Sequence, residues 1–360
     1  MVGGGAERQL TYLARELVHA GWDVHVAVIH GGPNAERLAA SGATVHLIRA
    51  FGNHDPLILG RLLRTIRAIQ PDVVQCWLLQ MEVAGGIAAS LSRTPWVFSE
   101  RAAPEAYRPS FKTWLRVKVA SWSTAIVSNS WIGDRYWQTR TGARVKRFVI
   151  PNGLPLDEIA AAPAATYDEA NLVPDEPLVL TAGRFEPEKN IDMLVRAIRL
   201  VSGTRPVQAL FCGDGSLRAS VAKLIHDEGL ADRIQLRGYV ANLWSLMKRT
   251  DVMVSASVFE GSPNVILEAM ACGTPLVVSD IPAHRELLDD QTAIFVNPAG
   301  PRELADAITA VLRDPAAASE RARRAQARVQ RYSVAAVARQ YADVYRAVST
   351  RGGRLRTATS

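Results

Sequence analysis

Residues 178–212 read LVLTAGRFEPEKNIDMLVRAIRLVSGTRPVQALFC and contain one complete alternation of two structural patterns. The apolar runs at 178–182 and 207–212 are short and rich in Val, Leu and Phe, which is typical of buried strands. Between them, 190–202 repeats its apolar residues with the period of an amphipathic helix. A strand, a helix and a second strand in this order predict two parallel strands joined by a crossover helix.

The same alternation extends over the rest of the chain. The other predicted strands lie at 24–30, 44–50, 72–78, 96–99, 124–129, 234–240, 251–256, 275–279 and 293–296. Further helical patterns lie at 6–20, 57–69, 216–229, 301–313, 316–331 and 334–348. Several strands are apolar on both faces, as a sheet covered by helices on both sides requires. We therefore expect an α/β chain with two doubly wound, Rossmann-like domains, whose ligands bind at the carboxyl ends of the strands.

Composition and charge place the domain boundaries. Four prolines fall within 151–176, and the sign of the net charge changes in the same stretch, which favours a linker. We expect a first domain at 1–153, a linker at 154–176, a second domain at 177–330, a C-terminal helix within 331–350 and a disordered tail at 351–360.

The amino end departs from this scheme. A glycine-rich turn at 3–5 follows only Met1 and Val2, which are too short to form the strand that precedes such a turn in a doubly wound domain. Either the start of the protein lies further upstream, or this domain lacks its first strand. We favour an upstream start, because a missing central strand would expose the edges of its neighbours.

The composition excludes several classes of protein. The 360 residues are 48% apolar and 21% charged, unlike a disordered or collagen-like chain. No apolar run reaches 18 residues, so we expect no membrane-spanning helix, and no signal peptide is visible. Cys76, Cys212 and Cys272 are too few and too widely spaced for a disulfide framework or a four-ligand zinc site. Because Cys76 and Cys212 lie in apolar runs, we expect buried thiols and therefore a reducing, cytoplasmic compartment.

The net charge of +7 is unevenly distributed. Residues 1–153 carry 18 Lys+Arg against 10 Asp+Glu, residues 154–314 carry 14 against 23, and residues 315–360 carry 10 against 2. The basic regions suggest an anionic partner, such as nucleic acid, an anionic membrane or a phosphorylated ligand, or else a solvated arginine-rich surface.

The most informative motif is FEGSPNVILEAMACGTP at 259–275, which follows a predicted strand. Ser262 is a favoured helix cap and Pro263 suits the first helical position, so we expect a helix whose amino end attracts a phosphate. Glu260 before the helix and Glu268 within it are candidate acceptors for sugar and ribose hydroxyls. The alternative is a capped helix that carries two surface glutamates.

Three further turns have composition suited to anions. AGRFEPEKN at 182–190 opens with a glycine and supplies Arg184 and Lys189, two cations able to hold a diphosphate. GDGS at 213–216 lies in the same position between a strand and a helix, and the glycine-rich turn at 3–5 leads into a helix. Each of these turns, taken alone, also fits an ordinary tight turn.

Together these motifs resemble the retaining glycosyltransferases of family four, which have the GT-B architecture of two Rossmann-like domains facing a cleft. The similarity includes GGAER at 4–8, IPNG at 150–153, GDGSLR at 213–218, GYV at 238–240 and the paired glutamates Glu260 and Glu268. It covers nearly the whole chain and is nearest to the subgroup that builds bacterial surface polysaccharides.

The resemblance implies a role for each matching residue. The residues implied to be catalytic are Glu260, Arg184, Lys189 and Arg101. The residues implied to bind the donor are Gly4, Gly183, Gly213, Tyr239, Val240, Gly261, Ser262, Asn264, Val265 and Glu268. In this scheme the two cations neutralise the diphosphate, Glu268 holds the ribose, Glu260 contacts the donor sugar, and the backbone near Tyr239 holds the base.

The resemblance also implies the partners. The donor is a nucleotide-sugar, a UDP- or GDP-sugar that is a co-substrate, and neither a metal nor another cofactor is expected. Transfer retains the anomeric configuration by same-face attack, with Glu260 as a covalent nucleophile the alternative. We expect a saccharide acceptor on a polyprenyl diphosphate and no nucleic acid. A soluble acceptor, or a non-catalytic nucleotide-sugar-binding protein, are the alternatives.

One departure from the family concerns residues 99–101, Ser-Glu-Arg, where many relatives have a histidine. Arg101 or Glu100 would occupy that position, unless the two simply pair with each other. The stretch 101–118 then interleaves basic and apolar side chains. Such a segment suits an anionic membrane or a diphospholipid, which would make the protein peripheral on the inner face of the plasma membrane, and an ordinary surface helix is the alternative.

Overall fold

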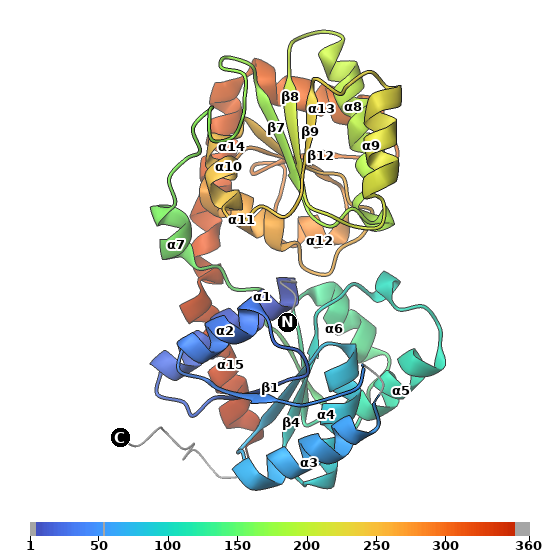
Figure 1. Cartoon of the computed structure of the whole chain (residues 1–360), viewed down its shortest axis with the longest axis vertical. Helices are drawn as coiled ribbons and strands as arrows, with labels where there is room; N and C mark the ends of the chain where they lie inside the picture. Colours follow the sequence, from blue (N-terminus) through green and yellow to red (C-terminus); the bar gives the residue numbers. More distant parts are fainter. Residues whose placement is uncertain (1–4, 53–54, 350–360) are drawn as a thin grey trace. The chain divides into compact units, whose positions relative to one another are not determined.

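The computed structural model describes residues 5–52 and 55–349, and these divide into two compact units (Figure 1). Unit 1 comprises residues up to Gly153 together with those from Tyr332, and unit 2 runs from Leu154 to Arg331. Both units consist of parallel strands joined by helices, as the alternation of patterns predicts. Residues 351–360, expected to be disordered, and Gly4 lie outside the described residues.

Unit 2 contains one six-stranded parallel sheet in the order β12-β11-β10-β7-β8-β9. Its strands are β7 (Leu178–Ala182), β8 (Gln208–Cys212), β9 (Ile234–Arg237), β10 (Val252–Ser255), β11 (Leu276–Ser279) and β12 (Ile294–Val296). Its helices are α7 (Leu156–Ala161), α8 (Ile191–Ser202), α9 (Arg218–Asp227), α10 (Leu243–Arg249), α11 (Asn264–Cys272), α12 (Pro282–Arg285), α13 (Pro301–Arg313) and α14 (Pro315–Arg328), with short 3₁₀ turns at Pro187–Lys189 and Val329–Tyr332.

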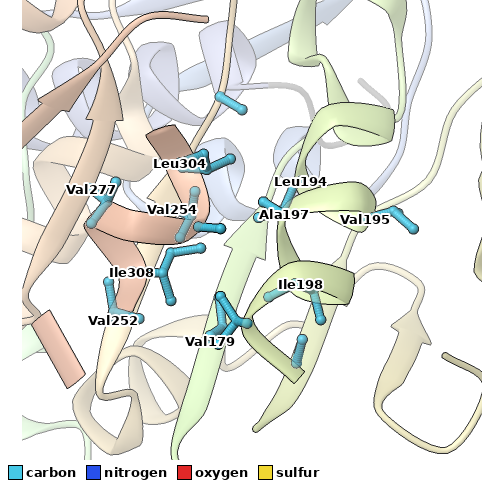
Figure 2. Close-up of a cluster of buried hydrophobic side chains, with 14 of the residues drawn as sticks. Val179, Leu194, Val195, Ala197, Ile198, Val252, Val254, Val277, Leu304 and Ile308 are labelled. Atoms are coloured by element: carbon cyan, nitrogen blue, oxygen red, sulfur yellow. The ribbon is translucent and has the colours of Figure 1, made fainter. Parts of the chain in front are cut away.

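The helical pattern at 190–202 explains how this sheet is covered. In α8 the side chains of Leu194, Val195, Ile198 and Val201 are buried, whereas Arg196 on the other face is exposed. These apolar side chains join those of α13 in a single cluster over the valines of β7, β10 and β11 (Figure 2). Burying such a stripe is the main source of stability for a helix of this length.

Unit 1 differs because its sheet is divided. The strands β1 (His25–Val28) and β2 (Thr44–Leu47) form one parallel pair. The strands β3 (Val74–Trp77), β4 (Trp96–Glu100), β5 (Ala125–Ser128) and β6 (Lys146–Val149) form a second sheet in sequential order. Among the described residues no hydrogen-bonded strand joins the two pieces, and a cavity of about 400 Å³ lies between β1 and β3. The edges of β1 and β3 that border this cavity pair with no strand of the described residues.

Helices cover both faces of the four-stranded sheet of unit 1 (Figure 1). The helices of unit 1 are α1 (Gly5–His19), α2 (Pro33–Ala40), α3 (Leu57–Ile69), α4 (Leu79–Leu91), α5 (Phe111–Ala120), α6 (Trp131–Gln138) and α15 (Val334–Val348), with a 3₁₀ turn at Pro104–Ala106. Of these, α2 packs on the β1–β2 pair and not on the four-stranded sheet. Strand β4 alternates between the two cores, because Trp96 and Phe98 pack with α3–α5 while Val97 packs with α1 and α15. The C-terminal helix α15 therefore belongs to the core of unit 1.

Two features differ from the sequence analysis. The stretch expected to be a linker, 154–176, is packed on unit 2: it contains α7, which contacts α11, and buries Leu154, Ile159 and Ala170. Its prolines lie between the short turns and α7 of a packed segment. Strand β6 has no counterpart among the predicted strands, because its sequence Lys-Arg-Phe-Val places two cations at a sheet edge. An edge strand with charged side chains carries little hydrophobic signal.

Candidate functional site

The order of strands in unit 2 places two predicted motifs at one point. Strands β7 and β10 are neighbours, yet the chain continues from β7 to β8 and from β10 to β11 on the opposite side. Ligands of doubly wound sheets bind where the strand order reverses in this way. The segment with Arg184 and Lys189 follows β7, and the segment with Glu260 follows β10.

Backbone hydrogen bonds join the turns at this edge of the sheet. The Gly183 N–H donates to the Cys212 carbonyl at 2.9 Å, and the Gly213 N–H donates to the Arg237 carbonyl at 2.9 Å. Gly213 has φ 143°, and a Cβ built there would lie 1.8 Å from the carbonyl oxygen of Gly183. Glycine is therefore required at 213, because only it allows the two turns to touch through their backbones.

Lys189 and Glu260 form an ion pair across the two segments. They are 71 residues apart, and the segments are also joined by a 2.9 Å hydrogen bond from the Val258 N–H to the Glu188 carbonyl. Glu260 Oε1 accepts a second bond from the Ser257 hydroxyl at 2.9 Å. The side chains of Lys189 and Glu260 are 18% and 13% exposed, so both are shielded yet reachable by a ligand.

Arg184 lies at the same edge with a different neighbour. Its guanidinium pairs with Glu188 at 3.0 Å, and its side chain is 73% exposed. A pair this exposed contributes little to stability, so the guanidinium is available to a ligand at small cost. The arrangement can therefore supply a second positive charge beside Lys189.

The amino end of α11 differs from the predicted cap. The helix begins at Asn264 with Pro263 at the N-cap, where the Pro263 carbonyl accepts from Ile266 and Leu267, at 3.0 and 3.3 Å. Ser262 makes no cap bond, because the extended backbone of Pro263 (φ −78°, ψ 90°) takes the capping position itself. As expected, the amino end of α11 is still the positive end of the helix dipole. Gly261 and Ser262 lie in the loop before it, and Val265 lies in its first turn.

The remaining predicted donor residues have contrasting environments. Glu268 is buried in the second turn of α11, at 4% exposure. Tyr239 follows β9 and is 74% exposed, and Val240 beside it is exposed to an intermediate degree. The backbone at 238–240 thus lies next to the turn of Gly213, whose N–H also approaches the Gly238 carbonyl at 3.0 Å.

Arg101 lies in unit 1 directly after β4. Its guanidinium donates to the Tyr341 hydroxyl at 3.1 Å and to Asn152 Oδ1 at 2.6 Å, and it stacks 4.3 Å above the Trp77 ring. Burial lowers the pKa of this guanidinium. The predicted catalytic cation thus contacts α15 and Asn152, which directly precedes the last residue of unit 1 before the chain enters unit 2.

Glu100, the alternative occupant of that position, has other partners. Its carboxylate accepts from the Ala102 N–H at 2.9 Å, the Tyr107 hydroxyl at 2.7 Å, Arg116 at 3.0 Å and the Trp137 indole at 2.8 Å. These contacts differ from the suggested Glu100–Arg101 pair. They attach the loop after β4 to the core of unit 1.

The predicted basic segment 101–118 is only partly exposed to solvent. Arg116 is 1% exposed and pairs with Glu82 at 2.5 Å as well as with Glu100, so it belongs to the core. The residues that reach solvent on α5 are instead aromatic: Phe111 is 72% and Trp114 53% exposed, and their rings stack 5.6 Å apart. The spacing of charges in the sequence does not reveal that one cation has two buried acidic partners.

Several site residues were not identified from the sequence. Glu186 joins the first two turns by accepting from the Ser216 hydroxyl at 2.7 Å and the Ser216 N–H at 3.1 Å, and these bonds lower its pKa. Ser257 and His284 lie beside Glu260, and burial lowers the pKa of His284. Single Ser and His residues carry no spacing signal, so only the fold brings them together.

Two family models match the chain. Residues 176–314 match the model described as Glycosyl transferases group 1, and residues 3–158 match the model described as Glycosyltransferase Family 4. This chain belongs to glycosyltransferase family 4. In this family 4 member the two matched regions correspond to the sheets of unit 2 and unit 1.

Curated relatives share part of their length with this family 4 chain. It is 32% identical over 251 residues to the phosphatidyl-myo-inositol mannosyltransferase of Mycobacterium leprae, covering 66% of this chain and 64% of that protein. It is 31% identical over 120 residues to the N-acetylgalactosamine-N,N'-diacetylbacillosaminyl-diphospho-undecaprenol 4-alpha-N-acetylgalactosaminyltransferase of Campylobacter jejuni, covering 33% of this chain and 32% of that protein. The alignments thus span about a third to two thirds of these relatives.

Solved structures establish the fold. HepE of Anabaena, in complex with UDP and glucose, superposes with a TM-score of 0.85 at 22% identity, covering 96% of both chains. At this identity the similarity shows the fold alone, which is GT-B-like with two α/β domains and parallel sheets.

Proposed function

We propose that this chain is a metal-independent, retaining glycosyltransferase that transfers a sugar from a UDP- or GDP-sugar to a lipid-linked saccharide during cell-surface polysaccharide synthesis. The observation that carries the proposal is the meeting of Lys189 and Glu260 where the strand order of unit 2 reverses. A cation for a diphosphate and an acceptor for sugar hydroxyls lie side by side at the place where such folds bind ligands. UDP in the HepE structure supports a uridine nucleotide.

The chemistry follows from charge. As the bond from the sugar to the diphosphate breaks, negative charge grows on the leaving phosphate oxygens. Lys189, the exposed Arg184 and the amino end of α11 offer positive charge that is in place before the reaction begins. These groups can fill the role that a divalent cation has in metal-dependent transferases, which is the basis for proposing that no metal is needed.

The contacts of Glu260 favour same-face attack over a covalent intermediate. One oxygen of this carboxylate accepts from both Lys189 and Ser257. Two donors on one oxygen hold the carboxylate as a hydrogen-bond acceptor and weaken it as a nucleophile. In the proposed route Glu260 fixes the donor sugar, and the leaving phosphate oxygen takes the proton of the acceptor hydroxyl.

The proposed lipid acceptor rests on unit 1 and on relatives. Phe111 and Trp114 expose stacked rings on α5, and Lys118 lies 5.9 Å from the Trp114 ring. Aromatic rings flanked by lysines suit the interface of an anionic membrane. The names of the two curated relatives, a phosphatidyl-myo-inositol and a diphospho-undecaprenol transferase, support a lipid acceptor. No helix in the described ranges is long and apolar enough to cross a bilayer. We propose that the exposed rings and the lysine of α5 attach the chain peripherally to the cytoplasmic face of the membrane.

The donor is tested directly. The full chain is incubated with a panel of UDP- and GDP-sugars, and both thermal stabilisation and nucleotide release are measured with EDTA and without it. We expect one donor to raise the melting temperature and, by transfer of its sugar to water, to release nucleotide equally in both buffers. Retention then predicts that an α-linked donor gives the free sugar first as its α-anomer, as followed by NMR. Failure of every donor to bind would refute the proposed function, and loss of activity in EDTA would refute metal independence.

Membrane attachment is tested separately by co-sedimentation with vesicles of phosphatidylglycerol or phosphatidylcholine. We expect the chain to sediment with the anionic vesicles and the variant Phe111→Ser/Trp114→Ser to remain in solution. Leu91→Ser is the matched control, since Leu91 is an exposed apolar residue at the C-terminal end of α4 and outside α5. Equal sedimentation of both variants would remove α5 from the proposal.

A further inference from the structure

A group of buried polar side chains lies near Glu260, at the ends of β10 and β11 and in the segments that follow these strands. Ser255 ends β10, Ser279 ends β11, Ser257 lies in the loop after β10, and His284 lies on the short helix α12. All four side chains are buried. Burying polar groups is unfavourable unless they are hydrogen-bonded, so their contacts indicate what they hold in place.

The direction of the hydrogen bonds at His284 follows from its partners. His284 Nδ1 lies 2.8 Å from the backbone oxygen of Ser279, which can only accept, so Nδ1 carries the proton. Burial lowers the pKa of this ring, which favours the neutral form. Nε2 is then an acceptor, and the Ser255 hydroxyl lies 3.4 Å away to donate to it.

Ser257 is held at two places. Its backbone oxygen accepts from the hydroxyl of Ser279, and its own hydroxyl donates to Glu260 Oε1 at 2.9 Å. An ionised carboxylate only accepts, so the direction of this second bond is fixed. The backbone of Ser279 is in turn fixed by His284, which completes a continuous path from His284 through Ser279 and Ser257 to Glu260.

We propose that Ser257, Ser279 and His284 are positioning residues that orient the Glu260 carboxylate, and through it the Lys189 ammonium. This inference rests on the proposed function, because Glu260 and Lys189 are the groups that would touch the donor. The path explains why one oxygen of Glu260 faces Lys189: Ser257 donates to that same oxygen and fixes the rotation of the carboxylate. A carboxylate left free to rotate would meet a sugar hydroxyl in the reactive geometry less often.

The test compares variants that keep or remove a single donor. Ser257→Ala is expected to lower kcat by roughly 10- to 100-fold while the Kd for the free nucleotide changes by less than about threefold. Ser257→Thr retains the hydroxyl and is expected to restore most of kcat. His284→Asn retains a donor in the place of Nδ1–H, so it should be less impaired than His284→Leu.

A double-mutant cycle separates positioning from general damage. If Ser257 acts through Glu260, Ser257→Ala should lower kcat no further in a Glu260→Ala background. Additive losses in kcat, failure of Ser257→Thr to rescue, or an equal loss of nucleotide affinity would each overturn the proposal.

The proposed function can fail without affecting this test. If the wild-type chain turns over no donor, the same cycle is read from thermal unfolding with Ser257→Ala and Glu260→Ala. Positioning then predicts a double variant whose loss in melting temperature is clearly smaller than the combined losses of the single variants. Independent losses would overturn the inference, whatever the activity of the wild-type chain.

Discussion

The buried cation Arg116 allows a quantitative prediction for unit 1. Its guanidinium pairs with Glu82 at 2.5 Å and Glu100 at 3.0 Å, and the three side chains are at most 2% exposed. The rings of Phe98 and Trp137 pack within 5 Å of the guanidinium carbon. Arg116→Met keeps most of the volume but leaves two carboxylates with no counter-charge. Removing one partner from a buried ion pair costs about 3–5 kcal/mol, and we expect a loss of that size at pH 8.

The loss should depend on pH, and its sign follows from Glu82. Burial raises the pKa of Glu82 to about 7, above its ordinary value of 4.5, even though Arg116 opposes this shift. A carboxyl whose folded pKa is raised contributes stability below its unfolded pKa and loses it as pH rises through the folded pKa. Without Arg116 the pKa rises further, so the variant can neutralise Glu82 by protonation at pH 5. The penalty should therefore be smaller at pH 5 than at pH 8.

Tryptophan fluorescence is a suitable assay, because only Trp244 of the eight tryptophans lies within 154–331. Urea unfolding followed by this signal reports mainly on unit 1, and the shift in midpoint multiplied by m gives the loss of free energy. Arg140→Met is the control, since Arg140 also lies over an aromatic ring, Tyr136, but is exposed. A loss below about 1 kcal/mol at pH 8, or one independent of pH, would refute the reasoning.

Three further outcomes are expected. Lys189→Ala and Glu260→Ala should each lower transfer severely while circular dichroism shows that the fold is intact; near-normal rates would remove that residue from the mechanism. Gly213→Ala should lower the melting temperature of unit 2 and abolish nucleotide binding, because the new Cβ would lie 1.8 Å from the Gly183 oxygen. A stable variant that still binds nucleotide would contradict the inferred backbone contact. Arg101→Ala should destabilise unit 1 by about 1–3 kcal/mol, since it releases two buried hydrogen-bond partners, and an unchanged urea midpoint would argue against this role.

The fold was largely predictable because strands and helices have different periods. The run at 207–212 differs from β8 by a single residue, and the helix predicted at 57–69 has the bounds of α3. Prediction failed for segments whose amino-acid composition does not indicate how they pack. Strand β6 is basic and lies at an edge, and 154–176 contains prolines typical of a linker although its leucines pack on unit 2.

The candidate site was predictable only in part. Motif positions at the ends of strands correctly placed Lys189 and Glu260 at one edge, because parallel strands end on the same side. The same reasoning does not find Ser257 or His284, whose partners come from other segments. Arg116 was misassigned to a surface for a related reason, since Glu82, 34 residues earlier in the chain, has no fixed spacing from it.

The contact between Gly183 and Gly213 has a consequence for anyone who wishes to redesign donor choice. The two turns meet through main-chain atoms, and Phe185 and Gly215 make a second such contact, with a Cβ at 215 lying 2.5 Å from the Phe185 oxygen. Because the contacts are between main-chain atoms, side chains cannot rearrange to accommodate a change in the length of either turn. A graft from another transferase must therefore exchange both turns together, whereas the exposed position of Tyr239 can be varied alone.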